Sequence, residues 1–132
     1  MLDSYDLDKA TIEKLAEDVL CTRYTVEGVV EESDAIEIDQ TYHFMAQGKE
    51  VFTLVDMTEA EVKMSAKAND FFSKRAKMVP NIKAVALVMD NLSSKVKQQF
   101  QMQIHKPLYP TKIFKKKEDA LKWFDELRQK EA

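Results

Sequence analysis

Two short polar clusters contain the residues whose types could do chemistry. Each cluster follows an apolar run, 51–55 or 84–89, and precedes a segment with helical spacing. The cluster residues are Asp56, Thr58, Ser65, Asp90, Asn91, Ser93 and Ser94. Beside the free amides of a helix N-terminus, such side chains can bind an anion or present a hydroxyl for phosphorylation. The same residue types also serve simply as helix caps and turn residues, and both interpretations stay open.

Other kinds of catalytic residue are scarce in this sequence. His43 and His105 fall on different predicted helices, and Cys21 falls in a predicted strand, where a thiol is usually a small buried hydrophobe. Neither a metal-ligand spacing nor a glycine-rich phosphate loop occurs. We therefore expect no enzyme, no metal and no cofactor. One enzymatic alternative stays open, an acid pair formed by Asp56 and Asp90, and it requires these carboxylates to approach each other.

The order of the expected elements predicts an α/β domain. Apolar and β-branched runs predict strands at 10–15, 19–24, 51–55, 84–89 and 112–115. Apolar residues at three- and four-residue spacing predict helices at 35–45, 65–79, 92–104 and 120–127. A hairpin followed by alternating helices and strands implies right-handed crossovers. We therefore expect one domain over 1–132, with a mixed, mainly parallel sheet of about five strands, about four helices, and frayed residues 1–8.

Two helix boundaries carry specific expectations. Gly48 stands where a left-handed residue is expected after the helix 35–45. The next helix could begin at Thr58, which has capping-box spacing to Glu61, or at Ser65, which precedes a cleaner apolar stripe. We favour Ser65, which leaves 57–64 as a loop or a single turn.

Composition limits where the protein is expected to work. No apolar run approaches the ~20 residues that span a bilayer. The acidic start of the chain lacks the basic and apolar regions of a secretory signal. A single cysteine allows no internal disulfide, which fits a reducing compartment. A cytoplasmic location without a membrane span is therefore expected.

The net charge of −3 is unevenly distributed along the chain. Residues 82–132 hold 11 Lys and Arg against 6 Asp and Glu, whereas residues 1–81 hold 9 against 17. A basic half could attract phosphate or nucleic acid, but the lysine run 115–117 has no interleaved aromatic residues on which bases could stack. We therefore expect no nucleic-acid partner. The opposite net charges of the two halves are expected to attract each other, either within the fold or between the subunits of a homodimer.

Four segments carry a likeness to a known group: 52–56, 84–88, 106–114 and 118–123. They resemble the STAS domain of bacterial anti-sigma-factor antagonists, and more narrowly the SpoIIAA-like (STAS/SEC14-type) bacterial proteins. The most distinctive motif is Pro-x-Lys-Ile-Phe followed by Glu-x-Ala-x-x-Trp. In the antagonists, a partner kinase phosphorylates a serine in an Asp-Ser-Ser-Gly-Leu loop. That motif is absent here, and Ser65 is the nearest positional counterpart.

The resemblance and the polar loop lead to a first hypothesis of function. A non-enzymatic module would bind a protein partner through the loop 56–65 and the adjacent helix face, with Met57 and Met64 as exposed apolar contacts. The alternative is a carrier of a small hydrophobic or anionic ligand, such as a lipid or a nucleotide, bound between the helices and the sheet. A solid core without a cavity would exclude the carrier.

Overall fold

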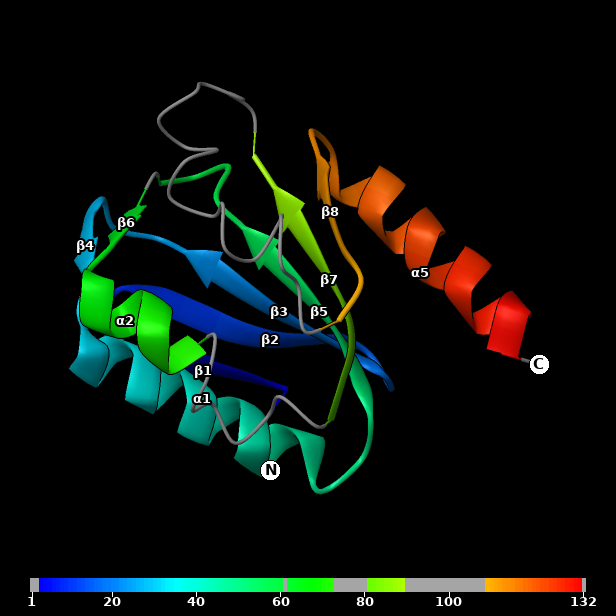
Figure 1. Ribbon diagram of the computed structural model, residues 1–132, viewed down its shortest axis with the longest axis horizontal. Helices are drawn as coiled ribbons and strands as arrows, with labels where there is room; N and C mark the ends of the chain where they lie inside the picture. The colour runs from blue at the N-terminus through cyan, green and yellow to red at the C-terminus, as the bar shows by residue number, and fades with distance from the viewer. Residues whose placement is uncertain (1–2, 61, 73–80, 90–108, 132) are drawn as a thin grey trace.

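The computed structural model describes residues 3–60, 62–72, 81–89 and 109–131, and a six-stranded sheet is its main feature (Figure 1). In spatial order the strands of this sheet are β1 (Ser4–Asp6), β2 (Ala10–Ala16), β3 (Val19–Tyr24), β5 (Val51–Asp56), β7 (Ile82–Val88) and β8 (Thr111–Phe114). A separate two-stranded sheet pairs β4 (Gly28–Val30) with β6 (Val62–Met64). The described helices are α1 (Glu32–Ala46), α2 (Ala66–Asp70) and α5 (Lys117–Glu131).

Strand pairing divides the main sheet into two parts. The strands β1, β2 and β3 pair antiparallel, whereas β3, β5, β7 and β8 pair parallel, each beside its predecessor. This confirms the predicted α/β class, the first hairpin and the mainly parallel sheet. The expected number of strands was too low, because the main sheet alone has six. The predicted helix at 92–104 lies outside the described residues.

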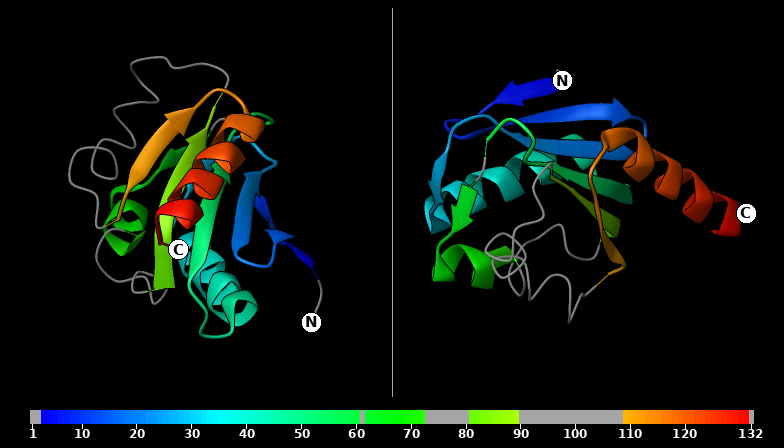
Figure 2. Two further views of the ribbon diagram at one scale, coloured as in Figure 1. Left: turned by 90° about the vertical axis from the view of Figure 1, so that its right-hand side faces the viewer. Right: turned by 90° about the horizontal axis from the view of Figure 1, so that it is seen from above.

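Helices cover both faces of the main sheet (Figure 2). The crossover helices α1 and α2 pack on one face, and the C-terminal α5 packs on the other (Figure 1). Both described crossovers step in the same direction along the sheet, so right-handed connections place their helices on the same face. We call the two sides the α1 face and the α5 face.

Successive residues of the central strands alternate between these two faces. In β7, Val85 and Leu87 contact the core under α1, whereas Ala84 and Ala86 contact the core under α5. A strand that is covered on both sides needs apolar residues at every position, which explains the uninterrupted run that the sequence shows here. The alternation fixes which side chains each helix meets.

Local signals explain where α1 begins and ends. Asp34 in its first turn accepts a hydrogen bond from the backbone amide of Glu31 at 2.8 Å, as an N-terminal acidic residue should. At the other end, Gln47 and Gly48 both have positive φ, 51° and 78°. The left-handed conformation predicted for Gly48 is confirmed, and Gln47 adopts it as well.

Two segments differ from the expectations. Residues 1–8 were expected to fray, but Ser4–Asp6 form β1, in which half-buried Tyr5 lies opposite Ile12. Residues 57–64 were expected to be a loop or a turn, but Val62–Met64 form β6, parallel to β4. Both strands are only three residues long, and a three-residue strand has too few alternating positions to stand out in a sequence.

Candidate ligand cavity

Asp56 lies where the sequence places it, at the end of β5, but it works as a turn residue. Its side chain is almost fully buried, and Oδ1 accepts hydrogen bonds from the Thr58 amide at 2.9 Å and the Thr58 hydroxyl at 2.7 Å. The other oxygen, Oδ2, lies 3.9 Å from Nζ of Lys117 at the start of α5. The carboxylate therefore holds the bend that follows β5, and Thr58 is exposed beside it.

Ser65 is the N-cap of α2, as predicted. Its Oγ accepts a hydrogen bond from the amide of Ala68 at 3.0 Å, and its own amide donates to the carbonyl of Val30 at 3.0 Å. Ser65 and Asp56 are thus held by different neighbours, β4 and α5 respectively. Both perform the capping and turning roles that the sequence left open as the simpler interpretation.

The remaining predicted site residues have mixed outcomes. Asp90, Asn91, Ser93 and Ser94 lie outside the described residues, as does His105, so the acid pair with Asp56 stays a prediction. His43 is exposed near the end of α1. Cys21 is fully buried, and burial raises the pKa of its thiol to about 12, so the predicted small buried hydrophobe is confirmed.

The two methionines assigned to an exposed loop are not exposed. Met57 is 4% exposed and belongs to the core of the α1 face. Met64 is half-buried in β6 and lines a cavity on the same side of the sheet. The expectation of an apolar contact surface at 56–65 is therefore wrong for Met57, whereas partner binding by this segment stays a prediction.

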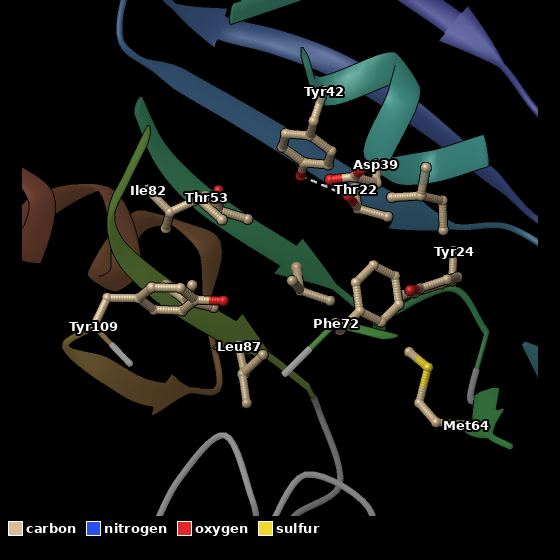
Figure 3. Close-up of a pocket in the computed structure, with 13 residues that line it drawn as sticks. Thr22, Tyr24, Asp39, Tyr42, Thr53, Met64, Phe72, Ile82, Leu87 and Tyr109 are labelled. Carbon is tan, nitrogen blue, oxygen red and sulfur yellow. Dashed lines mark hydrogen bonds between the residues drawn. The ribbon is translucent and has the colours of Figure 1, made fainter. Parts of the chain in front are cut away.

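The cavity lies between α1 and the main sheet (Figure 3). Its volume is about 90 Å³, several times the ~10–15 Å³ that holds one water molecule. Strands β3, β5, β6 and β7, helix α1 and the segments around Phe72 and Tyr109 supply its walls. The lining residues are Thr22, Tyr24, Ile38, Asp39, Tyr42, Thr53, Val55, Met64, Phe72, Ile82, Val85, Leu87 and Tyr109.

Strand and helix periodicity together bring these side chains to one place. Thr22 and Thr53 stand at positions of β3 and β5 that face α1, between apolar neighbours that face the same way. On α1, Ile38, Asp39 and Tyr42 are separated by one and three residues, so they share the side that meets the sheet. The fold therefore places hydroxyl groups on the floor of an otherwise apolar cavity.

Two hydroxyls on this floor form a direct pair. The Thr22 hydroxyl donates to the Tyr42 hydroxyl over 2.5 Å, and both side chains are buried (Figure 3). Burial raises the pKa of Tyr42 well above its ordinary value, and burial also raises the pKa values of Tyr24 and Tyr109. These phenols are therefore neutral at physiological pH and can donate hydrogen bonds.

Thr53 differs from Thr22. It is 6% exposed, and its Oγ1 has no hydrogen-bond partner among the described residues. In the sheet it lies between Leu20 of β3 and Val85 of β7, which offer only apolar side chains. Almost all buried polar side-chain atoms in native proteins have a partner, so this hydroxyl needs an explanation.

Sequence reasoning missed this cavity because its polar residues look ordinary one at a time. Threonine is a common strand residue, so Thr22 and Thr53 within β-branched runs indicate only that those runs are strands. A usable signal existed in the pattern of the predicted strands. A hydroxyl at a fully covered position of a central strand has no water to bond, so it indicates a polar partner or a ligand on that face.

The described residues show neither a membrane helix nor a metal centre. Within the ranges that the structure describes, no helix is long and apolar enough to cross a membrane. The same ranges contain no group of three or more His, Cys, Asp or Glu side chains that could hold a metal ion.

Comparison with solved structures identifies the fold class first. The chain is similar to an uncharacterized protein of the DUF3478 family with a SpoIIAA-like fold from Shewanella loihica PV-4, with a TM-score of 0.63 and 22% sequence identity. The match covers 91% of this chain and 97% of that one. At this identity the likeness concerns the fold, and it confirms the expected SpoIIAA-like architecture.

The family follows from the sequence itself. Residues 13–128 match the model of the domain of unknown function DUF7793, and the chain belongs to that family. No curated protein matches the chain. The fold and the family leave the activity to be inferred from the site.

Proposed function

We propose that the protein binds a small, largely apolar molecule in the cavity between α1 and the sheet. The observation that carries this proposal is the cavity itself, about 90 Å³ in volume and lined mainly by aliphatic and aromatic side chains. Small-molecule sites are typically concave and apolar, with a few polar groups that fix orientation. Of the two ligand chemistries that the sequence left open for a carrier, the lining favours the hydrophobic one.

The half-buried part of the wall supports this proposal. Met64, Phe72 and Tyr109 line the cavity without being fully buried, and they come from three different segments of the chain. A bound apolar molecule would remove part of their remaining surface from water. At ~25 cal/mol per Å² of apolar surface, such burial is the main driving force that a ligand of this kind needs.

A binding role fits the lining better than a catalytic one. Among the lining residues that the structure describes, Asp39 is the one carboxylate, and histidine, cysteine and lysine are missing. General acid–base catalysis needs a proton donor and acceptor matched to the working pH, and neutral tyrosines with raised pKa values do not supply a base there. We therefore assign the cavity a carrier or sensor role.

The test is to fill the cavity with a larger side chain and to measure whether the bound molecule is lost. Native mass spectrometry of the protein purified from its own source should show the chain with an added small mass. Val55→Phe puts a ring at a half-buried cavity position of a strand, where phenylalanine is well tolerated, and it should abolish the added mass. Leu121→Phe enlarges a half-buried side chain of α5, on the opposite face of the sheet, and should retain the added mass.

Two results would contradict the proposal. The first is an added mass that survives in Val55→Phe, because the molecule would then sit elsewhere. The second is the bare chain mass together with no binding of a small apolar probe such as toluene to the purified protein. Thermal denaturation of both variants checks that each has folded before its mass is interpreted.

A further inference from the structure

We infer that the molecule bound in this cavity is uncharged and carries an oxygen that hydrogen-bonds to Thr53. This inference rests on the proposed function and names the chemical class of its ligand. Two separate observations lead to it: the unpartnered hydroxyl of Thr53, and the charge of the cavity wall.

The first observation concerns where Thr53 can find a partner. Its Oγ1 is buried without a hydrogen bond among the described residues, and its neighbours in register on the same face are Leu20 and Val85. The sheet therefore offers this hydroxyl nothing on either side. A partner has to come from the α1 side, where Thr53 lines the cavity (Figure 3). Less than 1 Å² of Oγ1 is exposed, so the hydroxyl meets a ligand oxygen after Thr53 turns about its Cα–Cβ bond. A ligand oxygen could both accept from the hydroxyl and, as an alcohol, donate to it.

The Thr22–Tyr42 hydroxyl pair on the cavity floor also favours a ligand with an acceptor oxygen. In the Thr22–Tyr42 pair one hydroxyl donates to the other, so one hydroxyl hydrogen of the pair is left over. Burial keeps Tyr42 protonated, because it raises the pKa of the phenol. The floor therefore offers donors from two places, Thr53 and the Thr22–Tyr42 pair, and favours a ligand that brings an acceptor oxygen.

The charge of the wall argues against an anion. Asp39 is 4% exposed on α1, and among the described lining residues it is the one that carries a formal charge. A carboxylate or phosphate in the cavity would lose its hydration, and those described lining residues include no lysine or arginine to offset the loss. The acceptor oxygen thus belongs to an alcohol, a ketone or an amide rather than to an acid.

Four probes of nearly equal size separate these chemistries: toluene, benzyl alcohol, benzylamine and benzoate. Their dissociation constants for the wild-type chain are measured by NMR titration at pH 7. We expect benzyl alcohol to bind at least tenfold more tightly than benzoate. We also expect it to bind more tightly than benzylamine, because the ammonium group loses more hydration and Asp39 already interacts with another group.

Substitution of Thr53 tests the hydrogen bond itself. Thr53→Val keeps the shape and removes the hydroxyl, so it should weaken benzyl alcohol roughly three- to tenfold and leave toluene within about twofold. Thr53→Ser keeps the hydroxyl and should preserve the preference for the alcohol. Thr11→Val is the matched control, because Thr11 is a buried strand threonine that bonds to Asp6 outside the cavity wall, and it should change neither probe.

The outcomes separate this inference from the proposed function. If toluene binds but Thr53→Val weakens both probes equally, or weakens neither, the hydrogen bond is wrong and the apolar cavity stands. If benzoate or benzylamine binds more tightly than benzyl alcohol, the uncharged class is wrong. If none of the four probes binds to the wild-type chain, both the class and the cavity's role in binding are overturned.

Discussion

The two faces of the main sheet are built from different kinds of side chain. Under α5, the rings of Phe52 and Phe124 stack with centroids 4.8 Å apart, and Ala84 and Ala86 let the helix lie close to the strands. Under α1, the same strands present Thr53 and other residues around a cavity of about 90 Å³. One face is filled by aromatic rings, whereas the other contains space and hydroxyl groups.

This contrast indicates that the two faces of the sheet have different roles. A stacked aromatic pair and close helix packing maximise the contacts that stabilise a fold. A cavity and a buried hydroxyl without a partner both lower stability, and native proteins tolerate such features mostly where function requires them. The α5 face is therefore the structural one, and the α1 face is the one where we place binding.

The largest effect should come from emptying the α5 face. Phe124 is fully buried, and Phe124→Ala should lower the free energy of unfolding by about 3–5 kcal/mol. Phe72→Ala on the α1 face removes a ring that is only half-buried at the cavity. This substitution should lower the free energy of unfolding by less than half as much. Urea denaturation of the two variants measures both changes. Equal losses would mean that the faces do not differ in packing.

The two threonines on the α1 face should give changes of opposite sign. Thr53→Val removes a buried hydroxyl that has no partner among the described residues, so it should raise the free energy of unfolding of the ligand-free chain by about 1 kcal/mol. Thr22→Val breaks the bond to Tyr42 and should lower it by about 1 kcal/mol. Denaturant midpoints of the two isosteric variants provide the measurement. A loss of stability in both would show that Thr53 is satisfied in solution.

The sequence predicts the elements better than it predicts the cavity, for a physical reason. Strand β7 stands out because an uninterrupted apolar run has a strong signal, and Ser65 stands out because a cap residue acts on its own helix. The site at Asp56 was assigned from its place after a strand, and the residue in fact satisfies its own turn. Local signals thus identify local structure.

The cavity depends on contacts between separate elements, and a local sequence pattern does not contain such contacts. Thr22, Tyr42 and Thr53 lie on three elements that are far apart in the sequence, and only the pairing of β3 with β5 brings them together under α1. Whether a threonine in a covered strand meets a partner or a space is decided by side chains on another element. The sequence contains the hydroxyls of the α1 face, but packing decides which of them has a partner.

The smallest expected effect is a pH dependence confined to the α5 face. Arg128 on α5 donates two hydrogen bonds of 2.7 Å to Asp18 in the turn between β2 and β3, and these bonds lower the pKa of that carboxyl. A lowered pKa gives stability that is present above the unfolded value of about 3.9 and is lost as the pH falls through the folded value. Asp18→Asn should therefore lower the free energy of unfolding by about 0.5–1 kcal/mol at pH 7 and by progressively less below about pH 4.

The control for this pair is Glu126→Gln, which removes an equal charge from an exposed position of α5. Its effect on unfolding should be smaller and should not follow the same acid limb. If Asp18→Asn and Glu126→Gln change the free energy of unfolding in parallel between pH 3 and pH 7, the ion pair of Arg128 with Asp18 does not stabilise the packing of α5. The difference between the faces would then rest on the stacked rings alone, because the aromatic contact of Phe52 with Phe124 contains no group that titrates in that range.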